Sequence, residues 1–264
     1  MNTPAMIIDF EATDVSKEAE ATQLGWRHVF FDDEGHLWAD PLPLNRSEPY
    51  SNHVMCKPDR AISFGAMAVS HITPEDVHDQ FSHRKVVQVL PEGEAYIIAH
   101  NADYDIQVAA NAGVDVSQYK AICTQALARR LLPDLDSHSL GALTYAINPD
   151  LARQYCRNAH DAGWDVTFTL WLLEYICDMM KITSMEQLYL ASEEARIPTA
   201  FTFGKHKDKT IAEVRRTDSG YLRWIVANHD NAYLVQACTE ALNTSINHQV
   251  SDLIIDGFDN SKRY

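Results

Sequence analysis

The first hundred residues show the short apolar runs and two-residue alternation that are typical of β-strands. Residues 6–10 form an apolar run suited to a buried strand, and further strand-like runs follow at 26–31, 36–38 and 53–56. The sequence Asp32-Asp33-Glu34-Gly35 between two of these runs predicts a hairpin turn. Because side chains alternate along a strand, Asp9 and Glu11 are predicted to share one face at the carboxyl end of the first strand.

The following residues alternate between strand and helix patterns. A strand is expected at 95–99, then a helix from Asn101 to Asn111 that stops at Gly113. Another strand is expected at 121–123 and is followed by a helix that ends before Pro133. Apolar spacings of three and four then predict an amphipathic helix over 164–181, and a further helix is expected at 184–196. This order predicts an α/β fold with a mixed sheet flanked by helices.

The composition changes after Pro198, which predicts two domains, residues 1–183 and a small basic and aromatic C-terminal module at 199–250. The formal charge of the chain is −15, which by itself opposes contact with a polyanion. Residues 14–50 hold three basic and eight acidic side chains (3 − 8 = −5) and are interpreted as a solvated insertion and meander. Residues 205–223 hold six basic and three acidic side chains (6 − 3 = +3), the clearest basic concentration in the chain.

The cysteines and the apolar runs indicate in which cellular compartment the protein is expected. Five widely spaced cysteines lack the close pairs of a zinc or redox motif, so reduced thiols are expected, and the histidines show no zinc-ligand spacing. The chain contains no run of 18 apolar residues and does not begin with the basic-then-apolar order of a signal peptide. A soluble cytoplasmic protein with no membrane contact is therefore expected.

Acidic residues recur where strands end and helices begin. Asp9 and Glu11 end the first strand, while Asp103 and Asp165 each lie in the first turn of a predicted helix. We predict that these four carboxylates converge, which is electrostatically unfavourable without positive charge between them. Oxygen ligands favour Mg²⁺ or Mn²⁺, and His160, just before the last helix, suits a general base.

Three motifs carry a resemblance to a known family. The segments Ile8-Asp9-Phe10-Glu11-Ala12-Thr13, His100-Asn101-Ala102-Asp103 and His160-x4-Asp165 resemble, in this order, the three motifs of the DEDDh exonucleases, also called the DnaQ-like family. Further stretches at 57–63, 71–73, 123–131 and 201–205 resemble one branch of that family, so the likeness covers nearly the whole chain.

The resemblance implies a ribonuclease-H-like fold and a 3′–5′ exonuclease that hydrolyses DNA with two Mg²⁺ ions, for which Mn²⁺ would substitute. It places Asp9, Glu11 and Asp165 on one ion and Asp9 with Asp103 around the other. His160 would activate water, and the product would be a nucleoside 5′-monophosphate. DNA with a free 3′ end is the expected partner, in a repair setting. The predicted substrate-binding residues are Ala12, Thr13, His71, Asn101 and Lys205.

Some interpretations stay open at this stage. Asp14 and Phe64 stand where the family commonly has Gly and Pro, and no residue of 14–50 can be assigned as a wedge for duplex ends. The aromatic residues of the C-terminal module fit either nucleic-acid stacking or a small core. The alternatives in function are an exonuclease acting on RNA or oligoribonucleotides and a catalytically weak nucleic-acid-binding protein.

Overall fold

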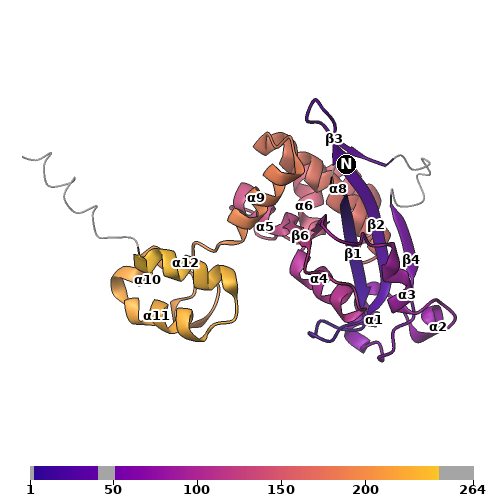
Figure 1. Cartoon of the computed structure of the whole chain (residues 1–264), viewed down its shortest axis with the longest axis horizontal. Coiled ribbons are helices and arrows are strands. Elements are labelled where there is room, and N and C mark those ends of the chain that lie inside the picture. Colours follow the sequence, from indigo (N-terminus) through magenta and orange to yellow (C-terminus); the bar gives the residue numbers. More distant parts are fainter. Residues whose placement is uncertain (1–2, 41–50, 244–264) are drawn as a thin grey trace, which may run out of the picture. The chain divides into compact units, whose positions relative to one another are not determined.

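The computed structural model describes residues 3–40 and 51–243, which fall into two compact units divided between Arg196 and Ile197 (Figure 1). The first unit contains a mixed six-stranded sheet, as predicted. Its strands are β1 (Ala5–Ala12), β2 (Ala21–Phe31), β3 (Leu37–Ala39), β4 (Asn52–Met55), β5 (Ala95–Ala99) and β6 (Tyr119–Cys123). Their order is β3-β2-β1-β5-β6, and β4 also pairs with β2.

The pairing changes direction at β1. Strand β2 pairs antiparallel with β1, β3 and β4, whereas β5 and β6 continue the sheet in parallel with β1. The parallel pairing of β1 with β5 ends at Ile7 and Ile98, so the last residues of β1 extend beyond β5. This overhang leaves room beside Asp9 and Glu11 for groups from the helices.

Residues 14–40 contain the meander of strands that the sequence predicted, but the segment also includes a strand that starts in the core and is therefore not a solvated insertion throughout. Residues 21–31 form β2, which pairs with three strands and begins with five buried residues. The predicted turn is present, with the Gly35 N–H donating to the Asp32 carbonyl and φ of +83° at Gly35. Residues 41–50 lie outside the described part of the chain.

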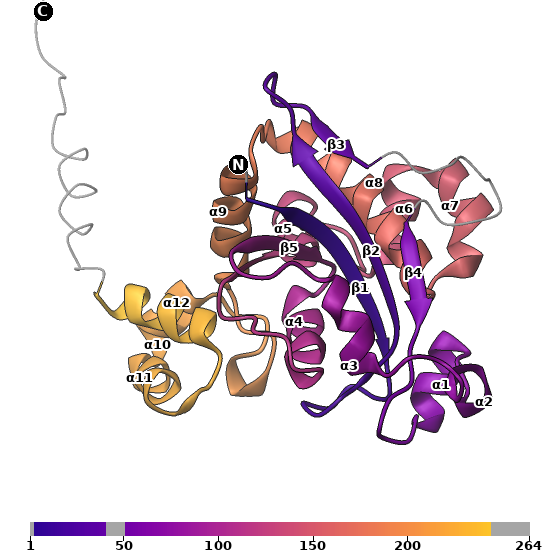
Figure 2. The same cartoon turned by 45° about the vertical axis from the view of Figure 1, so that its right-hand side comes forward.

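Helices cover both faces of the sheet (Figure 2). The helices of this unit are α1 (Phe64–Ser70), α2 (Pro74–Val77), α3 (His83–Val86), α4 (Ala102–Asn111), α5 (Thr124–Leu131), α6 (Leu140–Ile147), α7 (Pro149–Tyr155), α8 (Ala162–Met180) and α9 (Met185–Arg196). Ile7 packs with Phe168 of α8 on one face, and Met6 and Ile8 pack with Val108 of α4 on the other. The alternation along β1 thus divides the core into two layers.

The second unit is a small helical module with its own core. It contains α10 (Ile211–Thr217), α11 (Ser219–Asn228) and α12 (Ala232–Asn243), packed around Phe201, Leu222 and Ile225. Residues 201 and 203 do not form a strand, and only an isolated bridge joins Ala200 to Thr210. Of the predicted module, residues 244–250 lie outside the described range.

The first unit continues to Arg196, beyond residue 183, because α9 packs Leu188 into the core beside the sheet. The five cysteines are free. In the described part of the chain no helix is both long and apolar enough to cross a membrane.

Candidate active site

Strand β1 turns Asp9 and Glu11 toward the face of the sheet that α8 covers. Ile7 belongs to the core layer of α8, and side chains two and four residues later lie on the same face. Asp9 pairs with Gly25 of β2, and Glu11 pairs with Gln23. The two carboxylates therefore lie where β1 overhangs β5.

The first turn of α8 is held against β2 at this point. Gln23 Nε2 donates to Asp161 Oδ2 at 2.8 Å, and Gln23 Oε1 accepts from the Ala162 N–H at 3.0 Å. Asp161 also caps the helix by accepting from the Trp164 N–H at 3.1 Å. Gly25 allows the close approach, because a Cβ at this position would lie 2.2 Å from the Ala162 carbonyl oxygen. These contacts bring the start of α8 to Asp9 and Glu11.

Asp165 and His160 join the two carboxylates from α8 and the loop before it. The His160 N–H donates to Asp165 Oδ2 at 3.2 Å, and His160 adopts φ of +67°. Ligand atoms of Glu11, His160 and Asp165 all lie within 4.8 Å of one another. Asp165 Oδ1 is buried and has no hydrogen-bond partner among the described residues. The convergence predicted for these residues is present.

The third acidic position requires a correction, because Asp105 and not Asp103 reaches the cluster. Asp103 is 74% exposed, and its Oδ1 lies 2.6 Å from Arg196 Nη1. Asp105 is buried, and its Oδ1 accepts the Phe10 N–H at 3.1 Å. Phe10 lies beyond the last residue of β1 that pairs with β5. The Asp105 carboxylate therefore accepts the hydrogen bond that a neighbouring strand would otherwise accept.

The helical pattern contained a signal for Asp105. Ala102, Asp105, Val108 and Ala109 are the buried residues of α4, spaced by three and four. Asp103, by contrast, lies on a less buried face of α4. An acid on the more apolar stripe is the residue that the fold turns toward the sheet.

Burial and mutual repulsion disfavour ionisation throughout this cluster. The pKa of Asp9 is raised well above its usual value by burial and by the charges of Asp165 and Asp105. Burial together with Asp165 raises the pKa of Glu11 to about 8. Burial likewise raises the pKa of Asp165 to about 7, against the opposing hydrogen bond from the His160 N–H, and it raises that of Asp105. Positive charge between these carboxylates would stabilise their ionised forms.

A pocket opens at the cluster and contains part of the predicted substrate site. Its lining includes Asp9, Glu11, Ala12, Asn101, His160 and Asp165. Asn101 has φ of +74°, and its side chain makes no capping hydrogen bond to α4. It therefore remains available to the pocket.

The other predicted substrate residues have different surroundings. Thr13 is buried, and its Oγ1 accepts the Glu20 N–H. His71 is exposed after α1, and Lys205 belongs to the second unit, where its Nζ lies 2.7 Å from Asp218 Oδ2. Neither Thr13 nor His71 lines the pocket at the cluster.

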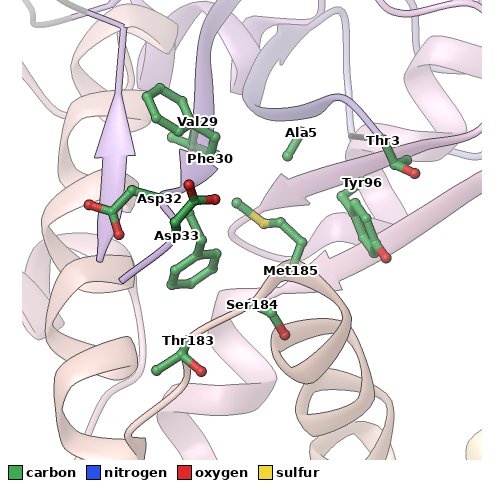
Figure 3. A pocket seen from close by; sticks show the side chains of 11 residues that line it. Thr3, Ala5, Val29, Phe30, Asp32, Asp33, Tyr96, Thr183, Ser184 and Met185 are labelled. Atoms are coloured by element: carbon green, nitrogen blue, oxygen red, sulfur yellow. The ribbon is translucent and has the colours of Figure 1, made fainter. Parts of the chain in front are cut away.

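Another pocket lies at the opposite end of β1, between the end of β2 and the start of α9 (Figure 3). Ala5, Tyr96 and Met185 are among the residues that line it. Asp32 at its edge is already engaged, since it accepts hydrogen bonds from the His36 N–H and from Trp38 Nε1. The pocket therefore has no converging set of acids comparable to the cluster around Asp9.

Comparisons with known proteins agree with this site. Residues 201–230 match the family model described as exodeoxyribonuclease X-like C-terminal. Exodeoxyribonuclease 10 of Escherichia coli K12 is 33% identical over 179 residues, which cover 67% of this chain and 77% of that protein.

The same likeness appears among solved structures. A structure of exonuclease X in complex with 5′ overhanging duplex DNA is 26% identical with a TM-score of 0.52, and the match covers 71% of this chain and 99% of that one. An E. coli exonuclease I structure with a dA16 oligonucleotide is 16% identical with a TM-score of 0.53, covering 75% of this chain and 44% of that one, and supports the fold alone.

The sheet order and these likenesses define a ribonuclease-H-like fold of the kind found in exonucleases. At this level of identity and coverage, the chain belongs to the exodeoxyribonuclease X family within the DEDDh exonucleases, and it is an exodeoxyribonuclease.

Proposed function

We propose that this exodeoxyribonuclease removes nucleotides from the 3′ end of DNA and releases nucleoside 5′-monophosphates. In this proposal Asp9, Glu11, Asp105 and Asp165 hold two divalent cations, and His160 is the general base. The observation that carries the proposal is the convergence of four carboxylates, all with pKa values raised chiefly by burial, beside one histidine.

The donor set fits hard divalent cations. All four acids offer oxygen ligands, which Mg²⁺ and Mn²⁺ prefer, and Asp165 Oδ1 is buried without a hydrogen-bond partner in the described part of the chain. Bound cations would supply charge stabilisation for the scissile phosphate and for the departing 3′ oxygen. Asp105 replaces Asp103 in this set because Asp103 is exposed and forms an ion pair with Arg196 away from the cluster.

The surroundings of His160 support its proposed role in proton transfer. It is an exposed residue that lines the pocket, and the hydrogen bond from its backbone N–H to Asp165 orients its loop. A free imidazole nitrogen would accept a proton from water as the water oxygen forms a bond to phosphorus. The bond from phosphorus to the 3′ oxygen of the preceding nucleotide would break, so no covalent enzyme intermediate is needed.

The substrate assignment rests on the pocket and on the relatives. Ala12 and Asn101 line the pocket, and the exposed apolar residues Val15 and Phe64 lie at or next to its lining. Phe64 is 88% exposed and adjoins the lining residues Ser63 and Gly65. Apolar groups at such a rim can contact the base of a terminal nucleotide. DNA is favoured because the solved exonuclease X structure contains a DNA duplex.

The decisive experiment compares two neighbouring acids of α4. Asp105→Asn should lower the exonuclease rate by about 10²-fold or more, since it removes a proposed ligand, whereas Asp103→Asn should stay within a few-fold of the parent. The assay follows a 5′-labelled DNA strand with Mg²⁺ beside its RNA counterpart and resolves products by length.

Three outcomes would contradict the proposal. A ladder that shortens from the 5′ end would refute the direction, faster cleavage of RNA would refute the substrate, and activity lost in Asp103→Asn but kept in Asp105→Asn would refute the ligand assignment. Asp9→Asn and His160→Asn serve as inactive references, and circular dichroism confirms that each variant folds.

A further inference from the structure

A second group of metal-ligand side chains lies outside the candidate active site. It consists of Glu20, Asp59 and His83, whose ligand atoms lie within 4.8 Å of one another. Glu20 directly precedes β2, Asp59 lies between β4 and α1, and His83 begins α3. The three residues thus join segments that are far apart in the sequence.

His83 is the unusual member of this group. Its side chain is 0% exposed, and neither ring nitrogen has a hydrogen-bond partner among the described residues. Buried polar groups are nearly always paired, so an orphaned imidazole calls for a physical explanation. Its Nε2 is directed at the two carboxylates, 3.6 Å from Asp59 Oδ2 and 3.9 Å from Glu20 Oε2.

These distances bear on how His83 contacts the two carboxylates. An N–H···O hydrogen bond spans about 2.7–3.2 Å, so both separations are too long for one. Neighbouring ligand atoms of a tetrahedral zinc ion, with bonds of about 2.0–2.1 Å, are about 3.3–3.4 Å apart. The two observed separations exceed this distance between ligand atoms by only a few tenths of an ångström. Small side-chain rotations can close the difference.

We propose that Glu20, Asp59 and His83 form a binding site for one Zn²⁺-type divalent ion, distinct from the acidic cluster. One imidazole and two carboxylates form a ligand set that suits zinc. Water would complete the coordination. Arg84 lies 3.3 Å from Asp59 Oδ2 at the surface, and ion binding would replace this exposed ion pair.

The site would brace the loop next to the active-site pocket. Glu20 Oε2 accepts the backbone N–H groups of Asp59 at 2.6 Å and Arg60 at 2.9 Å. The Thr13 N–H donates to the Glu20 carbonyl at 2.9 Å, and the Ser63 N–H donates to the Thr13 carbonyl at 2.8 Å. An ion on Glu20 would therefore connect α3 to the backbone that leads from Glu11 to α1.

The test measures zinc uptake by the full chain in a background that lacks two carboxylates of the acidic cluster. The parent is Asp9→Asn with Glu11→Gln, equilibrated with Zn²⁺, freed of excess ion on a desalting column and analysed for zinc per protein. Adding Asp59→Asn should remove the bound zinc, because Asp59 supplies one ligand and, being 64% exposed, tolerates substitution. Asp79→Asn, another exposed acid beside a histidine, is the matched control.

The expected result is about one zinc per chain in the parent and the Asp79 control and near zero in the Asp59 variant. Substituting Co²⁺ should give a visible absorption band that His83→Gln abolishes, provided that this variant keeps its circular dichroism spectrum. No retained zinc in the parent, or equal zinc in the Asp59 and Asp79 variants, would overturn the site. Neither result depends on nuclease activity, so the proposed function is tested separately.

Discussion

Asp103 and Asp105 show how the direction of a single side chain decides its role. Both lie in the first turn of α4, but they point to different surroundings, one to Arg196 at the surface and the other to the end of β1. Residues two apart on a helix are separated by about 200° around its axis, because each residue turns by about 100°. Proximity in sequence therefore does not make the two acids interchangeable.

The acidic cluster should make the cation-free protein less stable as the pH rises. The folded-state pKa of Glu11 is about 8, above its usual 4.5, so between these values the unfolded state releases a proton that the folded state keeps. Stability is then greatest below about 4.5 and declines until the pH passes about 8. The thermal midpoint in EDTA should fall over this range, by about 2–4 °C for each kcal/mol lost.

Mg²⁺ should reverse this trend, because cations bind the ionised carboxylates. The rise in melting temperature on adding Mg²⁺ is expected to be larger at pH 8 than at pH 5.5. Differential scanning calorimetry with and without EDTA measures both effects. Glu11→Gln should flatten the pH dependence, and a cation-free midpoint that increases with pH would show that the cluster does not carry this repulsion.

At the scale of elements, the contact of α8 with β2 sets the geometry of the site. The helix carries Asp165, and its first turn is fixed by Gln23 and by the close approach at Gly25. Since β2 pairs directly with β1, the same strand aligns Asp9 and Glu11 with the helix. The site thus depends on one strand that contributes no carboxylate to it.

Gly25→Ala should therefore damage both stability and activity. Its Cβ would overlap the Ala162 carbonyl oxygen, and overpacking of this kind costs about 1–3 kcal/mol. Displacement of Asp165 should lower the nuclease rate by about 10-fold or more, since small misplacements of reacting groups are costly. Melting temperature and single-turnover rate are the measurements.

Gly141→Ala in α6 is the matched control for this change. A Cβ there meets no atom within 4 Å, and alanine favours a helix over glycine, so stability should be unchanged or increased. Equal effects of the two substitutions would show that the close approach at Gly25 is not a constraint.

At the scale of the whole molecule, the negative net charge is unevenly distributed. The chain carries −15 in total, whereas residues 205–223 carry +3 within the second unit. Aromatic side chains accompany this charge, since Trp224 is exposed and stacks on Tyr221, while Phe203 stacks on His229. Phe201 and Ile225 form the core of the unit, so its aromatic residues divide between packing and surface.

If this surface binds single-stranded DNA, reversing two of its charges should weaken binding without slowing catalysis. Lys207→Glu with Lys209→Glu should raise KM for a long strand several-fold at low salt and leave kcat nearly unchanged. The slope of log KM against log salt should fall in magnitude by about 1.4, because each phosphate contact on a single strand contributes about 0.7.

Arg130→Glu with Arg153→Glu changes the net charge equally on the first unit, where both arginines form exposed ion pairs, and serves as the control. The same loss of affinity in both variants would indicate a general charge effect and would argue against a specific role for the second unit.

Local patterns were sufficient for much of the fold. The apolar runs of β1 and β5, the Asn101 start of α4 and the long helix before Lys181 were predicted because burial imposes short periodicities on a sequence. The separation of the C-terminal module followed from a change in composition. The strand β2 was underestimated, since its acidic flanks masked a segment whose first five residues are buried between neighbours.

The sequence by itself determined the kind of site, because Asp9, Glu11, His160 and Asp165 lie at strand and helix ends that any such fold brings to one edge. Only the tertiary structure decided between Asp103 and Asp105, because both acids lie in the first turn of α4 and only packing against β1 shows which of them is buried. The tertiary structure alone also brought Glu20, Asp59 and His83 together, because side chains that lie tens of residues apart in the sequence meet only in the folded chain.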